Sequence, residues 1–216
     1  MIEALLILGA YLVGSISPSV LLGRLFKHVD LREHGSGNAG TTNAFRVLGV
    51  KLGVAVLLAD VAKGFIPAMA ARSLVGPTAT VVVGLAAMAG HNWSLFLRGK
   101  GGKGVATGVG VLFALMPVTA AVLVAIFVVI LLSTSLVSLA SLFASSMLIP
   151  VAVATGKPLP YVVFSLLAVS FVVYAHRGNI RRLVTRREPH ATLSWRSLGR
   201  MIVRGTRGAE RSKYDE

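Results

Sequence analysis

Long apolar stretches separated by short polar segments make up most of this chain of 216 residues. Each stretch approaches the roughly 20 residues that a helix needs to cross a bilayer. Because lipid cannot satisfy exposed backbone groups, we expect helices in all of them. The pattern predicts an all-α, polytopic membrane helix bundle. The stretches are Ile2–Gly23, Leu52–Ala71, Leu74–Leu97, Val105–Leu132, Leu136–Gly156 and Pro158–Ala175.

The fourth stretch, Val105–Leu132, fits either one long kinked helix or two short ones, because Pro117 lies near its centre. Lys and Arg gather on the cytoplasmic side of a membrane, and this rule separates the two alternatives. With one helix, the basic C-terminal tail would lie outside. With two, nearly all basic residues are cytoplasmic, the exceptions being Lys63 within a span and Arg72 and Lys157 at outer turns.

We therefore predict seven transmembrane helices, with the N-terminus outside and the C-terminus in the cytoplasm. Half of the fourth stretch gives only about 20 Å of helix, so the two helices formed from it must be short or extend into the interfaces.

Composition supports a membrane protein, with 55% hydrophobic and 14% charged residues. The chain has no cysteine, which excludes disulfides and thiol catalysis. Its formal net charge of +14 would suit nucleic acid, but the charge lies beside apolar spans, where it indicates topology and contact with anionic lipids. We expect no nucleic-acid partner. We predict one membrane domain over residues 1–188 and a basic cytoplasmic tail over 189–216, which is disordered or lipid-facing.

Two glycine-rich segments interrupt the apolar pattern, at His34–Gly40 and Arg98–Gly104. Both match the G-x-G-x-x-G spacing of dinucleotide sites, but no strand–helix unit can surround either of them here. Small residues let backbone N–H groups turn toward one point, and cations nearby attract phosphate. The two segments therefore favour phosphate-bearing, lipidic substrates.

The first glycine-rich segment belongs to a longer polar segment, Arg32–Arg46, which is dense in small polar groups that suit phosphate oxygens. This longer segment ends in an arginine that can bind phosphate in bidentate fashion. A flexible loop of turn residues is the simpler alternative. We expect a helix to begin near Thr42–Arg46. The polar residues are Ser36, Asn38, Thr42, Asn43 and Arg46.

The second segment combines four glycines with Lys100 and Lys103. It is no Walker A loop, because Gly104 rather than Ser or Thr follows Lys103. A basic turn on the cytoplasmic side would need fewer glycines. The segment opens into a helix predicted to begin at Val105, whose dipole adds to the attraction of anions.

Other polar residues accompany the apolar spans. Asp60 and Lys63 share a helix face within the second stretch, either as a structural ion pair or to aim Lys63 at an inner cavity. His176 and Asn179 share a face after the last span and could reach the glycine loops. His91 fits a hydrogen-bonded scaffold role. The sequence contains no nucleophile elbow, no zinc motif and no paired acidic motif. Without the last two, we expect no metal.

Five motifs together resemble the bacterial acyl-phosphate-dependent glycerol-3-phosphate acyltransferase family. They occupy residues 34–43, 57–64, 100–107, 137–140 and 176–180, in the family's order. The resemblance implies a multi-pass enzyme of the bacterial cytoplasmic (inner) membrane that acts in phospholipid biosynthesis. It would transfer a fatty acyl group from acyl phosphate to the 1-hydroxyl of glycerol 3-phosphate, giving lysophosphatidic acid and phosphate. Because acyl phosphate is already activated, we expect direct attack without a covalent acyl-enzyme.

The resemblance also assigns residues. The catalytic positions are Ser36, Arg46, Lys103, His176 and Asn179. The substrate-binding positions are Gly37, Asn38, Thr42, Asn43, Gly101, Gly102 and Gly104. From their own places in the sequence we add Lys100 as a substrate-binding residue and Asp60 and Lys63 as supporting residues. The implied partners are the two substrates and membrane lipids, with no cofactor. A transporter for an organic phosphate is the alternative, disfavoured because the polar residues cluster at one membrane face.

Overall fold

The computed structural model describes residues 1–191, so almost the whole predicted tail over 189–216 lies outside the described residues. Within this range the regular structure is entirely helical, as the apolar pattern predicts. The helices are α1 (Ile2–Ser15), α2 (Pro18–Lys27), the 3₁₀ helix η1 (Leu31–Glu33), α3 (Thr41–Leu48), α4 (Val50–Leu74), α5 (Pro77–Asn92), α6 (Val105–Leu115), α7 (Pro117–Thr134), α8 (Val137–Ser146), α9 (Leu148–Ala154), α10 (Leu159–Ala175) and α11 (Arg177–Val184).

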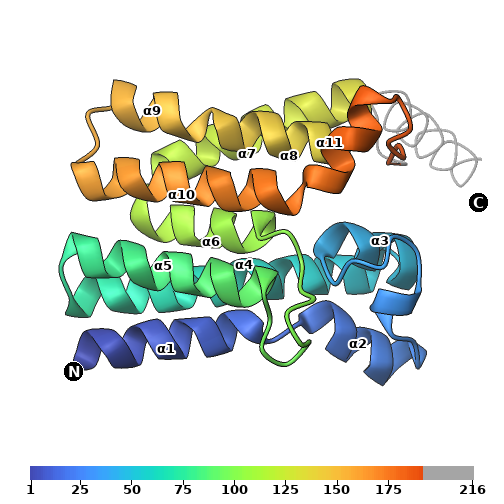
Figure 1. The fold of residues 1–216 in the computed structure, drawn as a ribbon, viewed down its shortest axis with the longest axis horizontal. Coiled ribbons are helices and arrows are strands. Elements are labelled where there is room, and N and C mark those ends of the chain that lie inside the picture. The colour runs from blue at the N-terminus through green and yellow to red at the C-terminus, as the bar shows by residue number, and fades with distance from the viewer. Residues whose placement is uncertain (192–216) are drawn as a thin grey trace, which may run out of the picture.

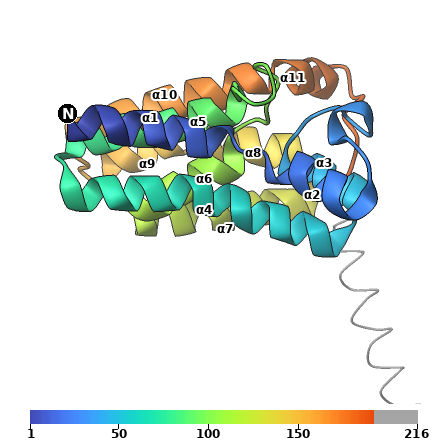
Figure 2. The ribbon, with the colours of Figure 1, turned by 90° about the horizontal axis from the view of Figure 1, so that it is seen from below.

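The long helices lie side by side along a common axis, and successive ones run in opposite directions (Figures 1 and 2). The short helices α2, α3 and α11 gather at one end of this bundle (Figure 1). The loop between α5 and α6 lies at the same end. The polar segments of the sequence, although far apart along the chain, therefore meet at one end of the molecule.

The fourth apolar stretch forms two helices, as the distribution of basic residues predicts. α6 ends at Leu115, and α7 begins at Pro117. Proline suits the first position of a helix, where its missing N–H costs nothing. The first stretch also breaks, since α1 ends at Ser15 and α2 begins at Pro18.

Several helices are long and apolar enough to cross a membrane. Within residues 1–191 these are Ile2–Lys27, Val50–Leu74, Pro117–Thr134 and Val137–Ala154, and α10 with α11, bent by 63°, forms a further candidate. α5 and α6 have only 16 and 11 residues. The all-α fold is thus confirmed, and several of its helices have the length and composition of membrane spans. The number of seven spans and the sides of the termini stay predictions.

Small residues bring the helices into close contact. A Cβ atom at Gly64 of α4 would overlap the carbonyl oxygen of Thr107 on α6. At Gly110 of α6 it would overlap the carbonyl of Val61 on α4. Close backbone approach through small residues is typical of membrane helices. The paired helices α4 and α6 therefore fix how the loops at their ends sit relative to one another.

Candidate active site

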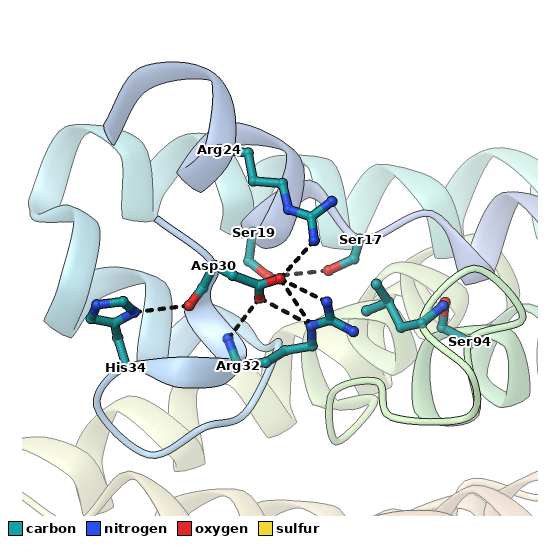
Figure 3. A network of polar contacts seen from close by, with 8 residues as sticks. Ser17, Ser19, Arg24, Asp30, Arg32, His34 and Ser94 are labelled. Carbon is teal, nitrogen blue, oxygen red and sulfur yellow. Dashed lines mark hydrogen bonds and ion pairs between the residues drawn. The ribbon is translucent and has the colours of Figure 1, made fainter. Parts of the chain in front are cut away.

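A charged network holds the chain just before the first glycine loop (Figure 3). Arg24 and Arg32 each donate to Asp30 Oδ2 over 2.7 Å. The hydrogen bond from Arg32 holds the pKa of Asp30 well below its usual range. His34, the first residue of the loop, donates from Nδ1 to the carbonyl oxygen of Asp30 over 2.9 Å. The start of the loop is thereby anchored.

The loop itself is shaped by Asn43, a predicted substrate-binding residue. Its Oδ1 accepts the backbone N–H of Ser36 over 2.9 Å. Its Nδ2 donates to the carbonyl oxygens of Leu31 (3.0 Å) and His34 (2.9 Å). Both amide hydrogens are therefore used by the backbone, so Asn43 fixes the shape of the loop.

The helix expected after this loop is α3, which begins at Thr41. Four of the predicted site residues in this region are exposed to solvent at the end of the bundle: Ser36, Gly37, Thr42 and Arg46. The hydroxyl groups of Ser36 and Thr42 lie close in sequence to the N-terminus of α3, whereas Arg46 belongs to its last turn. All three exposed side chains are available to an anion from solution.

The second glycine loop lies directly on the end of α5. The N–H of Gly101 donates to the carbonyl oxygen of Asn92 over 3.2 Å, and that of Gly102 to His91 over 2.9 Å. A Cβ atom at Gly101 would overlap the His91 carbonyl, and at Gly102 it would overlap the imidazole Nε2 of His91. Close approach to α5 therefore requires glycine at both positions.

These contacts correct one expectation about Gly101 and Gly102. Their amide groups, expected to face phosphate, are bonded to α5. The backbone N–H groups of residues 103–106, which follow directly, have no backbone acceptor within the described part of the chain. They open the first turn of α6, where the helix dipole attracts anions. Gly104, with φ of 78°, turns the chain into that helix.

Lys103 lies next to these free amides and contacts the predicted residue Asn179. Its Nζ donates to Asn179 Oδ1 over 2.5 Å, and Asn179 Nδ2 donates to Glu188 Oε1 over 2.5 Å. Arg182 donates to Glu188 Oε2 over 2.7 Å. A row of alternating charged and polar groups thus joins the second glycine loop to α11.

Burial lowers the pKa of Lys103 to about 8, and the carboxylate of Glu188 opposes this shift. Burial acts to raise the pKa of Glu188, but hydrogen bonds from Asn179 and Arg182 bring it below its usual value. Glu188 was not predicted as a site residue. Its signal in the sequence is that it is the one acidic residue among the five arginines of residues 176–191.

His176 is buried, and its Nδ1 lies 2.8 Å from the carbonyl oxygen of Val172. A carbonyl only accepts, so Nδ1 carries the proton of the neutral ring and Nε2 is left as an acceptor. Burial lowers the pKa of His176 to about 4, and the charge of Lys103 adds to this effect. His176 is therefore neutral at pH 7.

The two glycine loops meet. Asn38 Nδ2 donates to the carbonyl oxygen of Gly101 over 3.4 Å. The positive charge of Arg46 contributes to the lowered pKa of Lys103, so these cations act on the same region. Lys100 lies exposed in the turn after α5, apart from this polar row. The predicted pair of Asp60 and Lys63 also forms, with 2.9 Å between Oδ1 and Nζ.

The sequence model of the family described as glycerol-3-phosphate acyltransferase matches residues 4–186. The chain belongs to this family. A glycerol-3-phosphate acyltransferase of Bacillus velezensis is 44% identical over 88% of this chain and 97% of its own length. One of Fusobacterium nucleatum is 44% identical over 81% of this chain and 91% of its own. The family and these relatives support an acyltransferase.

Solved structures with a similar fold are also described as glycerol 3-phosphate acyltransferases. The fold of this chain is similar to a crystal structure of PlsY (YgiH), described as an integral membrane glycerol 3-phosphate acyltransferase in its glycerol 3-phosphate form. The TM-score is 0.85, with 40% identity, covering 88% of this chain and 96% of that one. A lysophosphatidic acid form of the same protein gives 0.84, with 38% identity over 88% and 95%. The family resemblance inferred from the motifs is thus confirmed, as is an integral membrane protein.

Proposed function

We propose that this protein transfers a fatty acyl group from acyl phosphate to the 1-hydroxyl of glycerol 3-phosphate, giving lysophosphatidic acid and phosphate. The observation that carries the proposal is the contact of Lys103 with Asn179 beside the free N-terminal amides of α6. A cation and unpaired amides at one point suit a phosphate. Family membership supplies glycerol 3-phosphate as the acceptor.

We assign the two phosphate-bearing substrates to the two regions around the glycine loops, which lead into α3 and α6. Lys103 and the α6 amides, with Ser36, hold the acyl phosphate in this scheme. Arg46, His176 and Asn179 hold glycerol 3-phosphate. The loop residues Gly37, Asn38, Thr42, Asn43, Lys100 and 101–104 shape or line these sites, and Asp60 and Lys63 support them. The assignment of each loop to one substrate is part of the proposal.

Acyl phosphate is already an activated mixed anhydride, so alignment and charge stabilisation are sufficient for transfer. The hydroxyl oxygen attacks the carbonyl carbon, and the bond from that carbon to the phosphate oxygen breaks. The unprotonated Nε2 of His176 accepts a hydrogen bond from the hydroxyl and orients it. With a pKa of about 4, His176 is a weak base, and the proton passes to the departing phosphate.

The same proposal includes the location, a bacterial cytoplasmic membrane crossed by seven spans with the site on the cytoplasmic side. The basic residues at the end of the bundle that carries both loops support this orientation.

The test uses purified full-length protein in detergent, with palmitoyl phosphate as donor. Phosphate release that depends on glycerol 3-phosphate, with lysophosphatidic acid as product, is the expected result. Transfer from acyl-CoA alone, or no turnover with either donor, would reject the proposal. Trapping an acyl group on Ser36 would replace direct attack with a covalent route. Uptake of labelled glycerol 3-phosphate into proteoliposomes would instead indicate the transporter.

A further inference from the structure

A buried polar cluster lies beneath both glycine loops. Its centre is Asp60 of α4, which is 1% exposed, and His91 of α5 is 5% exposed. The carboxylate Oδ1 lies 2.9 Å from Lys63 Nζ and 3.4 Å from His91 Nδ1. Its Oδ2 accepts a hydrogen bond from Thr41 Oγ1 over 3.0 Å. One carboxylate thus contacts residues on three helices.

Two of these contacts, those of Asp60 with Thr41 and with His91, connect it to the glycine loops. Thr41 is the first residue of α3 and directly follows the first loop. The imidazole of His91 lies against Gly102 of the second loop, and the backbone carbonyl of His91 accepts the Gly102 N–H. Lys103 follows Gly102 in the chain. Asp60 itself is too deeply buried to reach a substrate, so any effect on one passes through these neighbours.

Charge neutralisation alone does not account for the cluster. A buried carboxylate is costly without a partner, and Lys63 supplies that partner within the same helix. Lys63 Nζ is in turn held by the carbonyl oxygen of Ile16 over 2.7 Å. The additional contacts of Asp60 with Thr41 and His91 connect α4 to the segments that carry the two loops.

We propose that Asp60 is a positioning residue that holds the second glycine loop through His91 and the start of α3 through Thr41. This inference rests on the proposed function, because its measure is acyl transfer. Asp60 fixes the plane of the His91 ring, and the ring supports Gly102 from below. Without the carboxylate the ring turns and Lys103 is displaced together with the α6 amides. A displacement of about 1 Å at a catalytic group costs up to about a hundredfold in rate.

The experiment compares Asp60→Asn, His91→Leu and the double variant in acyl transfer, with kcat and KM measured for each substrate. Each single change is expected to lower kcat/KM about tenfold or more. The double variant should be no slower than the slower single variant, because both changes break one link. Losses that multiply in the double variant would overturn the proposal. Thr41→Ala removes only the link to α3, and a smaller loss is expected.

Asp60→Asn leaves Lys63 buried without a counter-charge, so Asp60→Asn with Lys63→Gln serves as a neutral second variant. The control is Thr80→Val in α5, which removes an equally buried hydroxyl bonded to the Gly76 carbonyl over 3.0 Å at the opposite end of the helix from His91. Thermal unfolding is measured for every variant. The control should keep wild-type kcat/KM whatever its melting temperature.

The outcomes separate the two proposals. An inactive wild-type protein rejects the proposed function. An active wild-type protein whose neutral double variant and His91→Leu keep their kcat/KM rejects the positioning role alone. Loss of melting temperature without loss of kcat/KM would show a purely structural cluster and would also reject it.

Discussion

At the scale of single residues, the lowered pKa of Lys103 predicts how activity depends on pH. Lys103 is charged below a pKa of about 8 and neutral above it, so kcat/KM should fall as pH rises through that value. The substrates do not titrate there, since phosphate esters have a second pKa of about 6. Arginine stays charged to about pH 12, so Lys103→Arg should lose the alkaline fall. The spontaneous hydrolysis of acyl phosphate is subtracted at each pH. An unchanged alkaline fall in Lys103→Arg would assign it to another group.

Glu188 should influence the pH at which kcat/KM falls, because it contributes to the pKa of Lys103. Its negative charge raises the pKa of Lys103 against the effect of burial. Glu188→Gln keeps an acceptor for Asn179 but removes the charge, so the alkaline fall in kcat/KM should move to lower pH. The measurement is the pH profile of this variant beside wild type. A shift to higher pH would contradict the contacts among Lys103, Asn179 and Glu188.

At the scale of elements, the second loop depends on how closely it packs on α5. Gly104 has a φ of 78°, and a Cβ there would lie 2.6 Å from Asn92 Oδ1. Gly99 has a similar φ of 77° but nothing within 4 Å of such an atom. Gly104→Ala should therefore lose most activity, whereas Gly99→Ala bears only backbone strain of about 1–2 kcal/mol.

A second substitution tests whether contact with Asn92 causes the loss of activity in Gly104→Ala. Asn92→Ala makes room beside residue 104 and should restore part of the activity lost in Gly104→Ala. The assay is acyl transfer at saturating substrates, with thermal unfolding as the measure of folding. Equal losses in Gly99→Ala and Gly104→Ala would show that backbone conformation, and not contact with α5, requires glycine here.

Local signals in the sequence located several elements and residues. Pro117 marked the break between α6 and α7, and the glycine segments marked the starts of α3 and α6. The pairing of Asp60 with Lys63 followed from helical spacing. By contrast, the support of Gly102 by His91 and the contact of Glu188 with Asn179 arise from packing between segments. No periodicity within one segment encodes such contacts, so these roles could not be predicted.

At the scale of the whole molecule, the alternating helices predict opposite sides for two turns. Ser73 lies in the last turn of α4, before the turn to α5, and Ser133 lies in the last turn of α7, before the turn to α8. The chain has no cysteine, so Ser73→Cys and Ser133→Cys each introduce a single thiol. A membrane-impermeant maleimide should label Ser73→Cys in intact cells and Ser133→Cys only after permeabilisation. Labelling of both from one side would contradict seven spans, and the wild-type protein is the unlabelled control.

In the proposed reaction, the shortness of α6 determines how deep the chemistry lies. Its 11 residues extend about 16 Å, roughly half of a hydrocarbon layer of about 30 Å. A lipid-borne donor can therefore meet the start of this helix while its tail stays among the surrounding lipids. Moving a palmitoyl chain into water would cost about 12 kcal/mol at about 0.8 kcal/mol per methylene. If α6 spanned the whole hydrocarbon layer, its start and the reacting phosphate would lie at the membrane surface. Much of the free energy needed to expose the acyl chain to water would then be required in every turnover.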